Sequence, residues 1–183
     1  MLKITYFVHS TTTDNEQRIL TGWAQGALSE HGIKQAKALA VKTNQKQFDL
    51  VFCSDLQRAV DSAHFAFSEK YEIVKDSRLR EINYGDLNQH HENEFNQDKY
   101  WSIHNNFPNG ESYQEVEARI ADFLEYLKAN FPNKHIAIVA HKVSQLAFDV
   151  LLNDSTWEQA IDDDWRLQKN WQPGWEYNVN IKA

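Results

Sequence analysis

Short apolar runs that favour β-strands alternate along this chain with longer segments that carry one apolar stripe. Strands are expected at residues 4–8, 48–53, 72–74 and 135–140, and helices at 28–41, 54–67, 112–129 and 144–152. A period of two residues favours a strand, and a period of 3.6 residues favours a helix. The alternation therefore predicts an α/β fold, a three-layer sandwich in which helices cover both faces of a mostly parallel central sheet.

The length of the chain fits one domain over residues 1–183. A chain of this size can bury a core without disulfides or a structural metal. The polar stretch at 78–108 is too long for an ordinary connection, so we expect an insertion with some helix of its own at the rim of a site. The aromatic tail at 165–183, with a turn at Pro173–Gly174, is expected to end in a strand.

Polar residues stand directly after three of the expected strands. His9 follows the first strand, Ser54 follows the second, and His141 follows the most apolar one. In open α/β sheets, ligands bind outside the carboxyl ends of the strands. The sequence therefore predicts a functional site that includes His9 and His141.

The charge of the chain limits its partners. A formal net charge of -7 would repel nucleic acids and anionic membranes, so neither is an expected partner. The single cysteine, Cys53, excludes an internal disulfide and lies in an expected strand, where an inert core thiol is the favoured interpretation. Because the sequence shows neither a membrane-spanning run nor a signal-peptide pattern, we expect a cytoplasmic protein.

Six motifs follow one another in an order that matches a known family. They are His9-Ser10-Thr11-Thr12 with Asn15, Gly22-Trp23 with 28–36, 54–59 with Ala63, 79–85, 108–112 with Arg119, and 136–141. Together they resemble the histidine phosphatase superfamily, which is also called the phosphoglycerate mutase-like family. The resemblance covers nearly the whole chain, and it implies the phosphoglycerate mutase-like α/β fold.

The resemblance also implies a reaction, the hydrolysis of a small phosphorylated metabolite without metal or other cofactor. In that scheme His9 is the nucleophile that forms a phosphohistidine, and Glu81 is the general acid and base. Arg58 and His141 would bind the phosphate oxygens, since guanidinium and imidazolium groups donate strong hydrogen bonds to phosphate. Phosphoryl transfer needs a nucleophile, a proton donor and cationic groups, and these four residues supply them.

Five further residues are candidates for phosphate or substrate binding: Ser10, Thr12, Asn15, Trp23 and Lys142. Two of them have plainer interpretations. The Asn15 side chain can hold the turn instead, and Trp23 is more typical of packing in a wall than of stacking on substrate.

Three positions depart from the family pattern. Val8 replaces the arginine that precedes the nucleophile, Ser10 replaces a glycine, and Lys142 stands where the family favours glycine. The first change removes a phosphate ligand. The alternative function is therefore a degenerate member that binds a phosphorylated ligand or protein with little turnover. Lys142 is the candidate replacement for the lost charge, unless it points to solvent.

The remaining expectations concern specificity and assembly. A mutase of this family usually has a longer chain and more basic residues, so a phosphatase, as a monomer or homodimer, is expected. Trp101 and His104 are candidate wall residues of the site. The residues His90–Glu94 suggest a metal site only weakly, because adjacent histidines rarely face one ion. The run 162–164 of aspartates predicts a charged surface turn.

Overall fold

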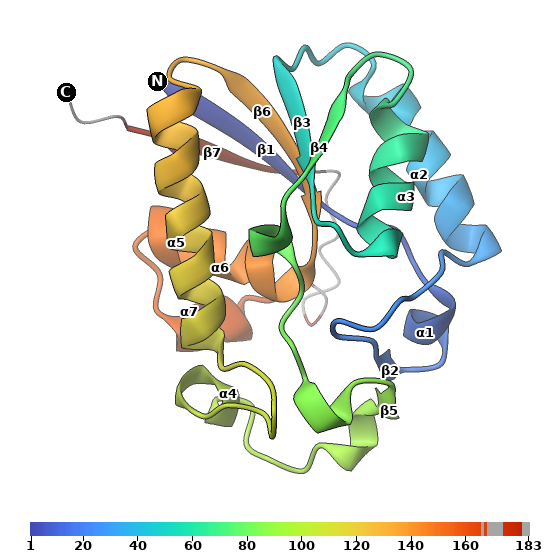
Figure 1. Ribbon diagram of the computed structural model, residues 1–183, viewed down its shortest axis with the longest axis vertical. Helices are drawn as coiled ribbons and strands as arrows, with labels where there is room; N and C mark the ends of the chain where they lie inside the picture. Colours follow the sequence, from blue (N-terminus) through green and yellow to red (C-terminus); the bar gives the residue numbers. More distant parts are fainter. Residues whose placement is uncertain (166, 168–173, 181–183) are drawn as a thin grey trace.

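The computed structural model describes residues 1–165, 167 and 174–180. Its centre is a five-stranded sheet in the order β4-β3-β6-β1-β7 (Figure 1). The strands are β1 (Leu2–Val8), β3 (Leu50–Cys53), β4 (Ile73–Lys75), β6 (His135–Ala140) and β7 (Trp175–Val179). The first four run parallel, and β7 pairs antiparallel with β1. The predicted mostly parallel α/β sheet is confirmed.

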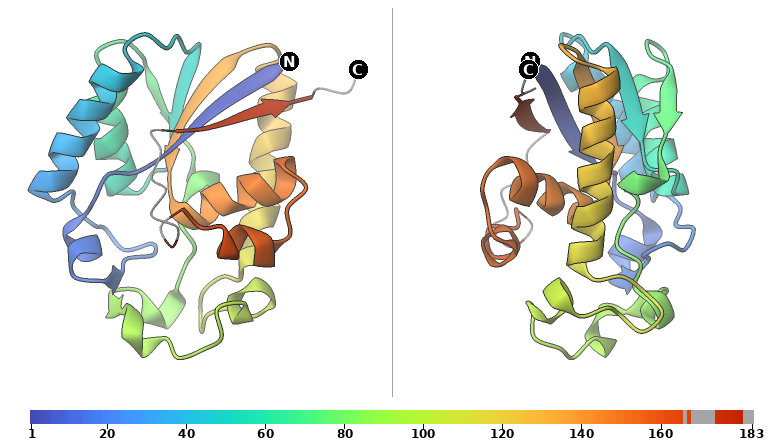
Figure 2. Two further views of the ribbon diagram at one scale, coloured as in Figure 1. Left: turned by 180° about the vertical axis from the view of Figure 1, so that it is seen from behind. Right: turned by 60° about the vertical axis from the view of Figure 1, so that its left-hand side comes forward.

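Helices cover both faces of this sheet, as the views from front and back show (Figures 1 and 2). One face carries α2 (Glu30–Thr43) and α3 (Gln57–Phe67). The other carries α5 (Tyr113–Asn130), α6 (Lys142–Leu152) and α7 (Trp157–Asp162). The three-layer sandwich therefore places one apolar core on each side of the sheet.

Strand β1 shows why the sheet has two cores. Successive side chains of a strand point to opposite faces. Tyr6 packs against Phe148 of α6 with ring centroids 5.1 Å apart, whereas its neighbour Phe7 packs against Phe67 of α3 at 5.5 Å. Because both faces of β1 are buried here, Tyr6, Phe7 and Val8 at its carboxyl end are consecutive hydrophobic residues.

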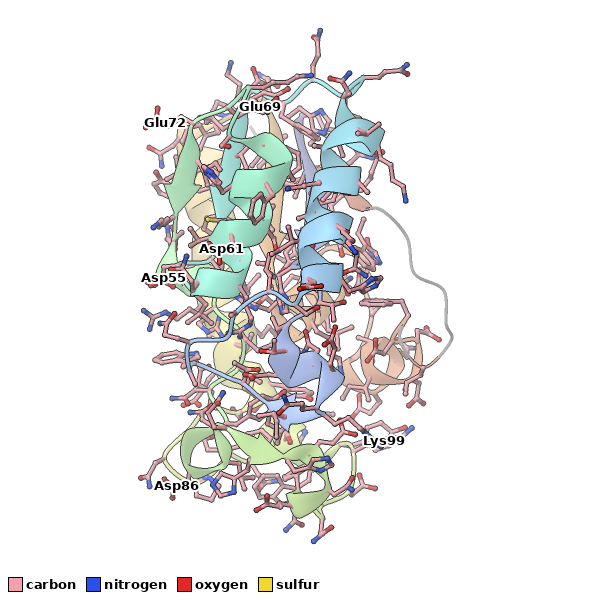
Figure 3. All side chains as sticks on the ribbon, turned by 90° about the vertical axis from the view of Figure 1, so that its right-hand side faces the viewer. Asp55, Asp61, Glu69, Glu72, Asp86 and Lys99 are labelled. Atoms are coloured by element: carbon pink, nitrogen blue, oxygen red, sulfur yellow. The ribbon has the colours of Figure 1, made fainter. Side chains whose placement is uncertain are left out.

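The segment 78–108 forms a rim beyond the carboxyl ends of the strands. In Figure 3, Asp86 of the rim lies at the opposite end of the molecule from Glu69 and Glu72, which precede β4. The rim holds η2 (Gly85–Leu87), β5 (His90–His91), η3 (Glu92–Glu94) and α4 (Trp101–His104), and η1 (Ser77–Leu79) leads into it. Strand β5 pairs with β2 (Ile19–Leu20), which follows the short helix α1 (Thr13–Glu16). The rim is thus attached to the loop that follows β1.

Several boundaries differ from the predicted ones. Helix α3 begins at Gln57 and not at Ser54, because Ser54 belongs to the turn that follows β3. Helix α6 begins at Lys142, directly after His141, and α7 was not predicted. The predicted final strand is confirmed as β7, and Pro173 of the predicted turn lies outside the described residues.

Two further expectations concern burial and membranes. Cys53 is fully buried in β3, as predicted, and burial raises the pKa of its thiol to about 12. Such a thiol is protonated and unreactive at neutral pH. In the part of the chain that the structure describes, no helix has both the length and the apolar character needed to cross a membrane.

Candidate active site

His9 lies at the carboxyl end of β1, where its backbone N–H donates to the Ala140 carbonyl at the end of β6, at 2.9 Å. Its ring Nδ1 is 2.8 Å from the Ser10 carbonyl oxygen. A carbonyl can only accept a hydrogen bond, so Nδ1 carries the proton. In its neutral form the ring then has its lone pair at Nε2, the atom that a nucleophilic role requires.

His141 is fully buried beside it. The two rings are 5.1 Å apart between centroids and inclined by 60°. The Tyr6 hydroxyl donates to the His141 carbonyl at 2.8 Å and accepts from the His141 N–H at 3.0 Å. A buried tyrosine hydroxyl needs such partners, and here the partners fix the backbone of the histidine.

The surroundings of the His141 ring lower its pKa. Neither ring nitrogen has a hydrogen-bond partner among the described residues. Burial first, and then the Arg58 cation and His9, hold the pKa of His141 well below its ordinary value. The ring is therefore neutral in this structure, and an anion placed beside it would favour its protonated form.

Glu81 is buried next to the first turn of α6. Its Oε1 accepts from the N–H groups of Ile82 and Val143 at 3.0 and 3.1 Å, and its Oε2 accepts from Lys142 N–H at 3.2 Å. A helix N-terminus has unpaired N–H groups that favour an anion. The carboxylate is thereby held at the end of the same helix that begins after His141.

Arg58 is one of the largest buried side chains of the protein, with 2% exposure. Its guanidinium donates to the carbonyl oxygens of Gly22 and Ala24, at 2.7 and 3.2 Å. Burial lowers the pKa of this guanidinium, and the Glu81 carboxylate raises it. Arginine stays charged in proteins, so Arg58 brings a positive charge into the interior.

One pocket of about 390 Å³ brings most of the predicted residues together. Its lining includes His9, Asn15, Arg58, Glu81 and Lys142, and the buried ring of His141 contacts the ring of His9 without lining the pocket itself. We call His9, Arg58, Glu81 and His141 the floor of this pocket. The volume is within the range of small-molecule sites, about 300–1,000 Å³.

Besides His141, three predicted residues do not line this pocket. The Ser10 N–H donates to the Ser62 hydroxyl at 2.9 Å. The Thr12 hydroxyl accepts from Asn15 N–H at 3.0 Å and caps α1. The Trp23 indole N–H donates to the Glu81 carbonyl at 2.7 Å, so this side chain fixes the backbone of Glu81.

Asn15 holds a turn and also lies in the wall of the pocket, while its contact with phosphate stays a prediction. Its side-chain oxygen accepts from Thr12 N–H at 3.0 Å and holds the turn, and the residue also lines the pocket.

Lys142 lines the pocket, but its ammonium also forms an ion pair. Its Nζ lies 2.9 Å from Asp164 Oδ2, and the Asp164 side chain is only 3% exposed. The prediction of a surface turn at 162–164 is therefore wrong for Asp164, although Asp162 and Asp163 are exposed. The reason is that the chain after α7 folds back towards α6, which sequence periodicity does not show.

The rim contributes different residues from those predicted. Trp101 packs against Phe95 and Phe107 inside the rim, and His104 is exposed, so neither lines the pocket. Tyr84 and Glu92 of the rim line it instead. The sequence could not show which rim residues line the pocket, because the rim is mostly irregular and has no periodicity.

Other residues at the site were missed. The pocket is also lined by Arg18, Ile19, Leu20 and Trp165. Arg119 donates to the Glu81 carbonyl at 3.0 Å and forms an ion pair with Glu111. The sequence offers one signal for Tyr6. It is a tyrosine in an expected buried strand, and a buried hydroxyl needs hydrogen-bond partners.

The histidines of the rim form hydrogen bonds with an acidic side chain and with a backbone group. His90 pairs with Glu94 at 2.8 Å, and His91 caps η3. Among the residues that the structure describes, no group of three or more His, Cys, Asp or Glu side chains could hold a metal ion.

Comparisons with known proteins agree with this geometry. The model of the "Histidine phosphatase superfamily (branch 1)" matches residues 6–168. A phosphoglycerate mutase from Schizosaccharomyces pombe is 30% identical over 172 residues, covering 84% of this chain and 80% of the relative. Phosphoserine phosphatase 1 from Hydrogenobacter thermophilus is 27% identical, covering 80% and 74%. The crystal structure of a putative α-ribazole-5'-P phosphatase from Escherichia coli superposes with a TM-score of 0.78 at 26% identity, covering 87% of this chain and 83% of that one.

Proposed function

Because this chain belongs to the histidine phosphatase superfamily, we propose that it hydrolyses phosphate monoesters of a small metabolite through a phosphohistidine at His9. The observation that supports this most directly is the pair of histidine rings 5.1 Å apart at the ends of β1 and β6. Arg58 and Glu81 line the same pocket as His9. The parts of the proposed reaction follow from these four residues.

His9 is the proposed nucleophile. Its Nδ1 proton is bound to the Ser10 carbonyl, so the Nε2 lone pair can attack phosphorus without a prior proton transfer. The new P–N bond forms as the bond from phosphorus to the leaving oxygen breaks. A good geometry at this step needs an in-line approach, with the leaving oxygen opposite Nε2.

Glu81 is the proposed general acid and then the general base. Oε1 accepts two backbone hydrogen bonds and Oε2 accepts one, so Oε2 is the oxygen that carries the proton more readily. That proton goes to the leaving alcohol oxygen. The carboxylate then takes a proton from water, whose oxygen attacks phosphorus as the P–N bond breaks, and phosphate and protonated Glu81 result.

Two groups would stabilise the transferring phosphoryl group. Arg58 would turn one edge of its guanidinium from the carbonyls of Gly22 and Ala24 to the phosphate oxygens. His141 would take up a proton beside the dianion and donate a hydrogen bond, because the negative charge reverses the effect of burial on its pKa.

Val8 leaves the site with one donor fewer than the family pattern. Loss of one preorganised donor typically costs about 2.7–4 kcal/mol of transition-state stabilisation. We propose that Lys142 replaces part of this, since it lines the pocket and Asp164 holds its ammonium in place. Lysine lacks the planar fork of arginine, so the replacement is partial.

The second candidate is a binding protein with little turnover, and the replacement of arginine by Val8 is the observation that favours it. One experiment separates the two candidates. The protein is mixed with a ³²P-labelled phosphate ester, quenched in the millisecond range, and digested. Acid-labile, base-stable label on the His9 peptide supports the phosphatase, and label on a hydroxyl or carboxylate residue contradicts the mechanism.

A screen of metabolite phosphates for released phosphate completes this test, with and without a chelator. Activity that survives chelation supports a metal-independent reaction, and activity that is lost contradicts it. If no substrate releases phosphate and vanadate does not bind, the binding protein is the better description.

We also propose the cytoplasm as the compartment and a monomer or homodimer as the state. The supporting observations are a single, buried cysteine and a net charge of -7. Cell fractionation and light scattering of the purified protein test these two proposals.

A further inference from the structure

The pocket has two zones of different chemistry. The first is the floor, whose side chains are charged or polar. The second consists of Ile19, Leu20, Tyr84 and Trp165, which we call the apolar wall. The wall residues are half-buried, whereas Arg58, Glu81 and His141 are buried, so the wall is the zone nearer to solvent.

The direction of the reaction determines which zone meets the alcohol part of a substrate. In an in-line transfer the leaving oxygen lies opposite His9 Nε2. The group bonded to that oxygen therefore extends away from His9 and the floor. The less buried lining residues, which such a group would meet, include two aliphatic and two aromatic side chains beside the paired Arg18 and Glu92, with Tyr84 from the rim and Trp165 from the chain after α7.

The charged residues that line the pocket also favour a substrate with a single anionic group. Besides Arg58, the cationic lining residues are Arg18 and Lys142. Arg18 is paired with Glu92, which also lines the pocket, and Lys142 is paired with the buried Asp164. A carboxylate or a second phosphate on the substrate would have to compete with one of these acidic partners, so the pocket does not match a second anionic group.

The apolar surface also extends past the catalytic pocket. Val8 and Trp165 line a neighbouring groove of about 500 Å³ as well, together with Leu39 and Trp175. The Trp165 and Trp175 rings lie 5.8 Å apart between centroids. His9 and Thr11 line both the pocket and the groove as well, and an arginine at position 8 would have added a charge where Val8 and Trp165 join the two.

From these observations we infer that the site is specific for phosphate monoesters whose alcohol is aromatic or otherwise apolar and carries no second negative charge. The inference rests on the proposed function, since it names the substrate class of that reaction. Burial of one aromatic ring favours binding by roughly tenfold or more, which sets the size of the effect to be measured.

The test uses three phosphonates that cannot be hydrolysed, measured by isothermal titration calorimetry. Ethylphosphonate and phosphonoacetate have nearly the same size and differ in a carboxylate, and benzylphosphonate adds a ring. We expect benzylphosphonate to bind at least about tenfold more tightly than ethylphosphonate, and phosphonoacetate to bind more weakly than ethylphosphonate. Equal affinities, or the reverse order, would overturn the inference.

Two sets of variants assign the effect to named residues. Trp165→Ala should reduce the preference for the benzyl compound severalfold, and Trp165→Phe should restore most of it. Tyr126→Ala is the control, because Tyr126 is an exposed aromatic residue on α5. A benzyl preference that Trp165→Ala leaves unchanged would remove this residue from the wall.

Glu92→Gln removes the acidic partner of Arg18, so it should raise the affinity for phosphonoacetate relative to ethylphosphonate. Glu94→Gln is its matched control, since Glu94 belongs to the same short helix but is not among the residues that line the pocket. If both variants change the affinity ratio equally, the change comes from the loss of any negative charge and not from the ion pair between Arg18 and Glu92.

Turnover is measured separately with benzyl phosphate, ethyl phosphate and phosphoglycolate. If none releases phosphate while the phosphonates bind in the expected order, the proposed hydrolysis fails and the specificity stands. If all three are hydrolysed at similar kcat/KM and the phosphonates bind equally, the specificity fails and the hydrolysis stands. A protein that binds no phosphonate contradicts both.

Discussion

The floor and the apolar wall of the pocket are built in different ways. The floor residues His9 and His141 follow adjacent parallel strands and are fixed by backbone hydrogen bonds within the core. The wall comes from a two-residue strand, the rim and the chain after α7. The two histidines are thus placed by the sheet itself, whereas the wall depends on segments that pack onto the sheet from elsewhere in the chain.

This difference separates reaction from selectivity. In the proposed reaction each floor residue acts on the phosphoryl group or on the leaving oxygen, so changes in the floor should alter the chemical step for every ester. The wall is proposed to contact the alcohol, so changes in the wall should alter the ratio between esters. Segments that vary while the scaffold stays fixed are common sites of specificity. The predictions below test this separation, beginning with the largest expected effect.

Replacing the nucleophile should have the largest effect. His9→Ala removes the atom that forms the P–N bond, so kcat should fall by at least about a thousandfold for all esters. The measurement is phosphate release from an alkyl and an aryl ester. His104→Ala, an exposed histidine of the rim, is the matched control and should retain activity. A substrate-dependent loss in His9→Ala would break the separation between floor and wall.

Replacing the acid and base should have the next largest effect. Glu81→Gln cannot donate the proton to the leaving oxygen, so turnover of an alkyl phosphate should fall by roughly a hundredfold or more. An aryl phosphate with a good leaving group should be affected less in its phosphorylation step. The comparison is made on kcat/KM, with circular dichroism to check folding. If Glu81→Gln hydrolyses the alkyl ester at the wild-type rate, Glu81 is not the acid.

The sequence could predict that the floor residues lie together because strand ends and motif order both indicate it, while their roles in the reaction stay predictions. His9, Arg58, Glu81 and His141 could be chosen from their positions after strands and from family motifs. Sequence reasoning failed for the wall because nothing in the sequence places Trp165 or Leu20 beside His9. Trp101 was chosen instead because it belongs to the same polar segment, although it packs inside the rim. Contacts between irregular segments have no periodicity to reveal them.

Lys142 lies between the two zones and should have an intermediate effect. Lys142→Ala should weaken vanadate binding by about tenfold, less than the loss of a full oxyanion donor, about 2.7–4 kcal/mol. Val8→Arg should raise activity if the pocket accommodates the longer side chain. Inhibition by vanadate measures the first effect, with Lys128→Ala on α5 as control. Unchanged vanadate affinity in Lys142→Ala would exclude Lys142 as the replacement for the missing arginine.

The smallest effect concerns the buried ring of the floor and the stability of the fold. Burial holds the pKa of His141 well below its ordinary value in the folded chain, whereas an unfolded histidine has a pKa of about 6.5. Below that pH the unfolded chain binds a proton that the folded chain does not, so this contribution to stability is present above about pH 6.5 and is lost as the pH falls. For one titrating group, the slope of the unfolding free energy against pH approaches about 1.4 kcal/mol per pH unit.

Urea unfolding of the wild type and of His141→Asn, each between pH 7.5 and 5, isolates this contribution as the difference between two curves. The wild type should lose more stability than the variant as the pH falls, while His104→Asn should behave as the wild type. Saturating phosphate should reduce the difference, since a dianion beside His141 lets the folded protein bind the same proton. Parallel curves for wild type and His141→Asn would mean that folding does not lower the pKa of this ring, and a smaller loss in the wild type than in His141→Asn would mean that the ring is already protonated in the folded protein. The proposed proton uptake on phosphate binding would then be wrong, whereas the roles of His9 and of the apolar wall do not depend on it.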